Sequence, residues 1–343
     1  MEIIRNLSMG EYFIKKYRNN KRPYSFNAKS PEEFYKWKKE FNDRLIECLS
    51  PFPSSVDPQP ILLERIDEGK YWREKIIFNS ELYMSVVAHV LVPKDIPAGE
   101  KRPGILAAHG HGNGKDDLCD INHGEYQKSD TISKLNYDYA KQFVLKGYVV
   151  IVPDWRGFGE RGKGGGPGKD LCDMLENKAL LFGENILTLN LWDAQCSISY
   201  LQSRPEVDPD RIGCVGLSYG GTMTLFTTIL DSRIKCAVVS GYLNKFGSFA
   251  ISNGHFCGAQ LPIGILQHGE LDDIACLIAP RPLLIESATN DRVFLIEASR
   301  EASKKVKSAY KVINSEKYFD TDEFNGSHEW SGTKAFNWMD QWL

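Results

Sequence analysis

The chain has 343 residues, of which 42% are hydrophobic and 25% are charged, and its formal net charge is −3. This composition is ordinary for a globular protein, and the length suits one large α/β domain with an extension. The small negative charge argues against nucleic acid or an anionic membrane as the main partner.

The N-terminal twenty residues lack the apolar core of a signal peptide, and no apolar stretch is long enough to cross a bilayer. The eight cysteines form no CxxC pair. Several lie in apolar runs such as "IGCVG", where a free thiol packs as a small apolar side chain. We therefore expect a reduced, cytoplasmic protein without a disulfide framework or a structural zinc site.

The first sixty residues predict a helical extension packed on the main domain. "SPEEFYKWKKEFNDRLIECL" begins with Ser30 and Glu33 in a capping box, with Pro31 at the first helical position. Three- and four-residue steps separate its apolar residues Phe34, Trp37, Phe41, Leu45 and Leu49. The proline-rich "SPFPSSVDPQP" then ends the helix. We expect residues 1–60 to form the extension and residues 61–343 the catalytic domain.

Strand and helix patterns alternate through residues 61–343. The predicted strands are 73–78, 85–93, 104–109, 148–154, 211–217, 235–241, 281–288 and 311–319. The predicted helices are 131–147, 186–204, 219–230, 295–310 and 333–343. This alternation predicts an α/β fold with a mostly parallel, eight-stranded sheet and helices on both faces. Residues from about 241 to 280 interrupt the alternation, as a cap-like insertion over a site would.

A candidate nucleophile lies between a predicted strand and a predicted helix. Gly216-Leu217-Ser218-Tyr219-Gly220 matches the G-x-S-x-G nucleophile elbow. Glycines stand two residues before and two residues after the serine because a sharp turn leaves no room for side chains at those positions. The N-terminus of the following helix favours developing negative charge. The alternative is an ordinary strand-to-helix turn that contains Ser218 by chance.

Ser218 would need a base, and the base would need an orienting acid. In enzymes with a nucleophile elbow of this kind, the acid and then the histidine follow the serine along the chain. His328 in "FNGSHEW" is the histidine near the C-terminal end, and Asp291 follows the predicted strand 281–288. Separately they could be a turn aspartate and a loop histidine. Because all three occur in the required order, we predict that Ser218, Asp291 and His328 are catalytic.

An oxyanion hole would complete this chemistry. We predict its donors to be the backbone N–H groups of Tyr219 and of His111, the latter in the loop "HGHGNGK". A metal cluster is the alternative for the residues in and after this loop, namely His109, His111, Asp116, Asp117, Cys119, Asp120 and His123. No recognised ligand spacing supports a metal there, and we expect none.

The stretch "DWRGFGERGKGGGPGKD" contains a formal G-x-G-x-x-G, but its glycines run into further glycines and a proline instead of opening a helix. We expect a turn and then a flexible loop at the mouth of the site. Trp155, Arg156 and Glu160 are candidates to line it, although a structural role for the turn is the alternative. His255 and Gln260 are further candidates for substrate binding, with a packed loop as their alternative.

Five segments together make the chain resemble the α/β-hydrolase superfamily, and within it the acetyl xylan esterase-like branch near the dienelactone hydrolases. They are "AAHGHGNGK", "VVIVPDWRGFGER", "EVDPDRIGCVGLSYGG", "LIAPRPLLIESATNDRVF" and "GSHEW", within residues 104–328. The resemblance implies a carboxylic-ester hydrolase that uses Ser218, Asp291 and His328 on a small-molecule ester, without a cofactor. None of these segments lies in residues 1–60.

The leading hypothesis is therefore a serine esterase that cleaves short-acyl or acetyl esters, including those of sugars. One alternative is a serine peptidase of the prolyl oligopeptidase type, whose catalytic domain shares "DPDRIG" and the elbow. Such enzymes usually carry a large propeller, for which residues 1–60 are too few. The other alternative is a catalytically silent α/β-hydrolase fold that serves as a binding protein, although such proteins typically lose a triad member.

Overall fold

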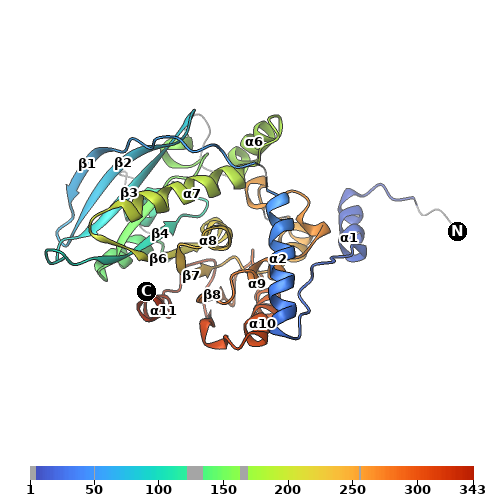
Figure 1. Cartoon of the computed structure of the whole chain (residues 1–343). Coiled ribbons are helices and arrows are strands. Elements are labelled where there is room, and N and C mark those ends of the chain that lie inside the picture. The colour runs from blue at the N-terminus through green and yellow to red at the C-terminus, as the bar shows by residue number, and fades with distance from the viewer. Residues whose placement is uncertain (1–4, 50, 122–133, 163–168, 255) are drawn as a thin grey trace.

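The computed structural model describes residues 5–49, 51–121, 134–162, 169–254 and 256–343. Within these ranges nine strands form a single mixed sheet in the order β1-β2-β3-β5-β4-β6-β7-β8-β9 (Figure 1). The strands are β1 (Ile61–Asp67), β2 (Tyr71–Glu81), β3 (Met84–Pro93), β4 (Arg102–Ala108), β5 (Val149–Pro153), β6 (Val207–Leu217), β7 (Ile234–Ser240), β8 (Leu283–Ala288) and β9 (Phe319–Phe324).

The direction of the strands divides the sheet into two parts. β1, β2 and β3 are joined antiparallel, and β3 also pairs antiparallel with β5. From β5 to β9 every pairing is parallel. The mostly parallel α/β sheet predicted from the sequence is confirmed, but it has nine strands and not eight. The additional strand is β1, whose side chains are largely exposed on both faces and therefore lack the alternation that marks a half-buried strand.

Helices cover both faces of the sheet. The described ranges include α1 (Met9–Asn19), α2 (Pro31–Glu47), α3 (Lys115–Leu118), α5 (Tyr139–Leu145), α6 (Lys169–Leu180), α7 (Ile186–Ser203), α8 (Tyr219–Leu230), α9 (Leu271–Cys276), α10 (Ile296–Val312) and α11 (Ala335–Trp342). Residues of α2, α7, α8, α9 and α10 share one apolar core with one face of the sheet. Residues of α5 and α11 form a second core on the other face. Among the helices of the described ranges, none is both long and apolar enough to pass through a bilayer.

The N-terminal segment is packed into the domain. In α2 the hydroxyl of Ser30 accepts a hydrogen bond from the N–H of Glu33, as a capping residue does. The apolar face of α2 is buried in the same core as α8 and α10, and Figure 1 shows α2 beside α9 and α10. In α1, the Tyr17 hydroxyl donates to Glu270 at 2.9 Å, just before α9. Both helices therefore contact the part of the chain that lies between β7 and β8.

Two predicted elements differ from the structure. The strand expected at 311–319 is wrong, because α10 continues to Val312 and β9 occupies Phe319–Phe324. β9 is an edge strand in which the four residues between Phe319 and Phe324 are all polar or charged, so no apolar run marked it. The helix expected at 131–147 is interrupted: Lys134 is helical, Asn136 adopts a positive φ of 50°, and α5 begins at Tyr139. Residues 131–133, and the glycine-rich 163–168 expected to be a flexible loop, lie outside the described residues.

Short helical turns and one short α-helix connect β7 to β8. A π-helical turn (Gly247–Ser252), two 3-10 turns (Gly258–Gln260 and Ile265–Gln267) and α9 follow one another. Aromatic rings hold the first of them to the domain: the Phe249 ring centroid lies 5.1 Å from that of Phe294. Phe294 in turn stacks on the imidazole of His328, with centroids 5.7 Å apart. The segment predicted as a cap-like insertion is thus linked through Phe294 to His328, one of the candidate catalytic residues.

Phe41 tests whether α2 belongs to the cooperative core. Its side chain is fully buried, so Phe41→Ala should lower the free energy of unfolding by about 3–5 kcal/mol, since it leaves a cavity. Urea unfolding of the full chain, followed by tryptophan fluorescence, measures this change. The matched control is Tyr35→Ala on the exposed side of α2, which should change stability by about 0.5 kcal/mol or less. Equal effects of the two substitutions would contradict the prediction.

Candidate active site

The turn between β6 and α8 holds Ser218 in a strained backbone conformation. Ser218 has φ 63° and ψ −121°, outside the regions that a non-glycine residue normally occupies. Its N–H donates to the carbonyl oxygen of Ser240 at the end of β7, at 3.0 Å. A Cβ on Gly220 would lie 1.9 Å from the carbonyl oxygen of Ala108, and one on Gly216 would lie 2.3 Å from the carbonyl oxygen of Gly220. Only glycine fits at both positions, as the elbow motif requires.

Asp291 and His328 meet at the ends of β8 and β9. The Nδ1 of His328 lies 2.7 Å from Oδ2 of Asp291. The other oxygen of this carboxylate, Oδ1, accepts from the N–H groups of Val293 and Phe294 at 2.7 and 3.0 Å. Burial alone would raise the pKa of Asp291, but the hydrogen bond and charge of His328 and the two backbone donors outweigh burial and hold the pKa below its ordinary value. The carboxylate is therefore fixed as an ionised acceptor for His328.

The imidazole of His328 lies at the same end of the sheet as Ser218, where the parallel strands have their carboxyl ends. A Cβ built on Gly241 would be 3.3 Å from Cε1 of the His328 ring. Gly241 directly follows Ser240, which accepts the hydrogen bond from the Ser218 N–H. Because Asp291 engages Nδ1, the Nε2 atom of the ring is left for another partner. The structure thus gathers the three predicted catalytic residues at the carboxyl ends of the parallel strands.

The loop after β4 is pressed against the elbow. A Cβ on Gly110 would lie 3.3 Å from Cβ of Ser218 and 2.9 Å from the carbonyl oxygen of Leu217. The N–H of Gly110 donates to the hydroxyl of Tyr137, which is buried. This close approach brings the backbone of His111, the next residue, beside the turn that carries Ser218. This position of the His111 backbone suits its N–H for the role of oxyanion donor that was expected from this loop.

A buried lysine holds this loop in place. The Nζ of Lys115 contacts Asp154 at 2.9 Å and Glu160 at 2.6 Å, and its own N–H donates to Asp154 at 2.7 Å. Burial would lower the pKa of Lys115, but these carboxylates and Asp116 outweigh burial and raise it. Asp116 also bonds His89 of β3 at 2.7 Å. Several charged contacts therefore join the start of α3 to β3 and to the turn after β5.

The three residues expected to line the mouth are engaged inside the turn after β5. The indole N–H of fully buried Trp155 donates to the carbonyl oxygen of His109 at 3.2 Å. Arg156 makes two hydrogen bonds to the buried Asp193 of α7, at 2.9 and 3.0 Å. Glu160 pairs with the buried Lys115. These contacts give Trp155, Arg156 and Glu160 the structural role that the sequence left as an alternative, and contact with substrate stays a prediction.

The two candidates from the β7–β8 segment can be placed only in part. His255 lies outside the described residues. Gln260 is buried, accepts from the N–H of Cys257 at 3.1 Å and donates to the hydroxyl of Thr222 at 3.2 Å. Gln260 therefore fastens the insertion to α8, which supports the packed-loop alternative for this residue.

Two cysteines, Cys172 and Cys257, lie near the loop, and the sequence did not indicate that they meet there. The Nε2 of His111 lies 3.3 Å from Sγ of Cys257 and 3.7 Å from Sγ of Cys172. Hydrogen bonds from Cys257 and His111 lower the pKa of the Cys172 thiol below its ordinary value, despite burial. No motif marked this group, because the three residues come from separate segments without ligand spacing.

The metal cluster considered for the HGHG loop does not assemble as a whole. Among the described residues, the one group of three or more possible metal ligands is His111 with Cys172 and Cys257. The other described members of the sequence cluster have contacts elsewhere: His109 accepts from the N–H of Trp155, Asp116 bonds His89, Asp117 accepts from Asn113, Asp120 accepts from Lys141, and Cys119 is packed in the second core. His123 lies outside the described residues.

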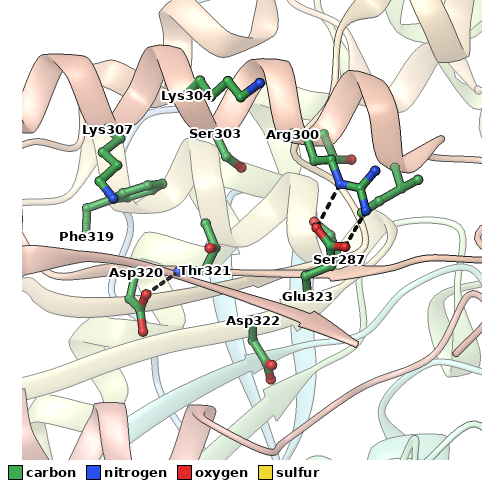
Figure 2. A pocket seen from close by; sticks show the side chains of 12 residues that line it. Ser287, Arg300, Ser303, Lys304, Lys307, Phe319, Asp320, Thr321, Asp322 and Glu323 are labelled. Atoms are coloured by element: carbon green, nitrogen blue, oxygen red, sulfur yellow. Dashed lines mark hydrogen bonds and ion pairs between the residues drawn. The ribbon is translucent and has the colours of Figure 1, made fainter. Parts of the chain in front are cut away.

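A hollow of about 190 Å³ between α10 and β9 contains two further acids, Asp320 and Asp322. Figure 2 shows both on β9, with the ion pair between Arg300 and Glu323 beside them. Asp320 pairs with Lys334, and Asp322 accepts from the hydroxyl of Ser331 at 2.7 Å. Asp291 is therefore the carboxylate that contacts His328, while Asp320 and Asp322 have partners of their own.

A buried glutamate anchors the loop that follows His328. Glu286 in β8 accepts from the N–H groups of Gly332 and Ser331, at 3.0 and 3.4 Å. Burial and the nearby charge of Asp322 raise the pKa of Glu286 to about 7, more than these hydrogen bonds lower it. The carboxyl group therefore changes its charge near neutral pH, behind the loop that carries His328.

This shift makes the stability of the domain depend on pH. The folded state binds the proton of Glu286 more tightly than the unfolded chain, so stability falls as pH rises from about 4.5 to about 7. Glu286→Gln removes this contribution, which is about 1.4 kcal/mol for each pKa unit. The loss of unfolding free energy between about pH 5 and pH 8 should be smaller in Glu286→Gln than in the wild type. Glu297→Gln, at an exposed position of α10, is the control, and its unfolding free energy should change with pH as that of the wild type does. If the unfolding free energy of Glu286→Gln also follows the wild type across this pH range, the prediction is wrong.

Two solved structures share the fold at low sequence identity. A candidate acetyl xylan esterase from Bacteroides fragilis NCTC 9343 superposes with a TM-score of 0.79 at 22% identity, over 93% of this chain and 83% of that chain. Acetyl xylan esterase 1 from Thermoanaerobacterium sp. JW/SL YS485 gives a TM-score of 0.58 at 20% identity, over 99% of each chain.

Curated relatives of known sequence match the chain to different extents. A candidate hydrolase of Bacillus subtilis (strain 168), YtaP, is 28% identical over 285 residues, which cover 79% of this chain and 87% of YtaP. Human dipeptidyl peptidase 8 is 26% identical over 67% of this chain, but the match spans only 22% of that protein. The sequence model of the Abhydrolase family matches residues 5–330, including most of the N-terminal segment that the motifs left uncovered. The chain therefore belongs to the Abhydrolase family.

Proposed function

We propose that the protein is a serine hydrolase that cleaves small carboxylic esters with short acyl groups, acetyl above all. The observation that carries the proposal is the hydrogen bond between Asp291 and His328 beside the strained turn of Ser218. An ionised acid that orients an imidazole, next to a serine on an elbow, is the arrangement that activates a hydroxyl nucleophile.

In the proposed mechanism the Oγ of Ser218 attacks the ester carbonyl while Nε2 of His328 takes its proton. The oxyanion accepts hydrogen bonds from the N–H groups of His111 and Tyr219. Asp291 stabilises the imidazolium, which then protonates the leaving alcohol. Water, deprotonated by His328, attacks the acyl-enzyme and releases the acid together with free Ser218. No step requires a cofactor.

The environment of the elbow supports a short acyl group. The rings of His111, Phe158 and Tyr219 pack on one another beside it, with centroid separations of 5.2–5.5 Å. Phe158 and Tyr219 are both fully or almost fully buried, so this side of the turn is filled with side chains. The overlap with the two acetyl xylan esterase folds, over 93% and 99% of this chain, supports an acetyl ester, such as that of a sugar.

We also propose a domain organisation and a cellular compartment for the protein. Residues 1–60 would be an extension on the catalytic domain 61–343, and residues from about 241 to 280 a cap beside the site. The eight free cysteines support a reducing compartment such as the cytoplasm. The partial match to dipeptidyl peptidase 8 keeps a serine peptidase as the second candidate.

Ser218→Ala separates an active hydrolase from a silent binding protein. A fluorophosphonate probe should label the wild type at Ser218 and leave Ser218→Ala unlabelled, because the probe needs an activated nucleophile. Mass spectrometry of the labelled peptide identifies the position. Ser327→Ala, at an exposed serine of the same site region, is the control and should still be labelled. A wild type that resists the probe, or labelling that survives Ser218→Ala, would contradict the proposal.

Acyl length and leaving group define the substrate class. We expect kcat/KM to fall from acetyl to butyryl to octanoyl esters of one phenol, because a filled pocket cannot accept the longer chains. An open apolar groove would instead favour octanoyl by about 0.8 kcal/mol for each buried methylene. The same preparation is tested on acetylated sugars and on proline-containing dipeptide amides. A rise toward octanoyl would overturn the short-acyl proposal, and faster cleavage of the amides would favour the peptidase.

A further inference from the structure

Three side chains with metal-binding atoms converge beside the loop after β4. They come from that loop (His111), from α6 (Cys172) and from the β7–β8 insertion (Cys257). Their donor atoms, one ring nitrogen and two sulfurs, all lie within 4.8 Å of one another. Both cysteines are buried, and His111 is half-buried. We infer that His111, Cys172 and Cys257 bind a single soft divalent cation of the zinc class.

The spacing of the donor atoms suits a tetrahedral cation. With metal–sulfur and metal–nitrogen bonds of about 2.3 and 2.0 Å, tetrahedral ligands place nitrogen and sulfur about 3.5 Å apart. The observed separations of Nε2 of His111 from the two sulfurs are 3.3 and 3.7 Å, on either side of that value. Two thiols and an imidazole are also the donors that Zn²⁺ prefers, whereas Mg²⁺ and Ca²⁺ select oxygen.

Hydrogen bonds next to the two cysteines hold them side by side. Asp173, the residue after Cys172, accepts from the N–H of Gly258, the residue after Cys257, at 2.7 Å. This bond ties α6 to the insertion immediately beside both sulfurs. The N–H of Cys257 is also held by Gln260, which is fastened in turn to α8. Such supporting contacts fix ligands in position before a metal binds, as in established metal sites.

The cation would join three segments that are distant in the sequence. Three protein ligands leave a fourth tetrahedral position for water or a small ligand. Because His111 belongs to the loop pressed against the elbow, the cation would clip this loop to α6 and to the insertion. The inference concerns cation binding alone, so it stands or falls independently of whether the protein hydrolyses esters.

Cobalt titration tests the site directly. The full chain is reduced, stripped of metal with a chelator, transferred to chelator-free buffer and titrated with Co²⁺. A single equivalent should produce the intense near-ultraviolet absorption of thiolate-to-cobalt charge transfer. Zn²⁺ should then remove this absorption, because it binds such sites more tightly than Co²⁺ does. Zn²⁺ should also raise the Tm of the stripped protein, because a ligand that binds only the folded state stabilises it.

Single substitutions decide whether these residues are the ligands. Cys172→Ser and Cys257→Ser should each abolish the charge-transfer absorption and the Zn²⁺-dependent rise in Tm. Cys196→Ser, at a partly exposed cysteine of α7 that lies outside the cluster, is the matched control and should keep both. If a serine variant is unfolded by circular dichroism, His111→Gln removes the third ligand in its place. A reduced wild type without the absorption, or absorption that survives substitution of both cysteines, overturns the inference.

Discussion

The contact between the Ser218 turn and β4 is the constraint on which the site depends. Gly220 lies so close to the carbonyl oxygen of Ala108 that no side chain can be placed there. The first turn of α8 is therefore in direct contact with the end of β4, and the loop that leaves β4 must pass over the turn. The strained backbone of Ser218 persists because this packing, together with the hydrogen bond to Ser240, leaves it no relaxed alternative.

Buried ion pairs hold the loops around the elbow in place. Lys115 and Asp154 are both inaccessible to solvent and satisfy each other. Arg156 and Asp193 form a second buried pair that fastens the same turn to α7. Removing one partner of such a pair leaves a desolvated charge, which is more costly than the pair itself is stabilising. The loops around Ser218 are thus held by contacts that tolerate few substitutions, although they lie outside regular helices and strands.

The sequence predicted those parts of the fold that follow a periodic pattern or a motif. α8 begins directly after Ser218 as expected, and Asp291 and His328, 37 residues apart, are in contact. β1 and β9 were missed or misplaced because their side chains are exposed or charged, so burial imposed no apolar pattern on them. Trp155 and Arg156 have polar groups that resemble those of a substrate site, and only the three-dimensional contacts show that these groups are satisfied internally.

The contact of His111 with Cys172 and Cys257 is a feature of a different kind that the sequence could not predict. Nothing in the spacing of these residues indicates that they meet, since tertiary packing alone brings α6, the insertion and the loop after β4 together. The same is true of Glu286, whose unusual proton affinity arises from its position inside the sheet and not from its neighbours in the sequence. Periodicity predicts which residues are buried, but not which polar groups share a buried space.

The exposed strand β1 has a consequence for how copies of the chain meet one another. It forms one edge of the sheet and begins with three exposed aliphatic residues, Ile61, Leu62 and Leu63. An open edge of this kind can pair with the edge of another molecule and seed aggregation. Here the pairing of β1 with β2 shifts between Leu62 and Glu64, and all residues from Glu64 to Asp67 except Ile66 are charged. The irregularity and the charges restrict edge-to-edge pairing to the first few residues of β1.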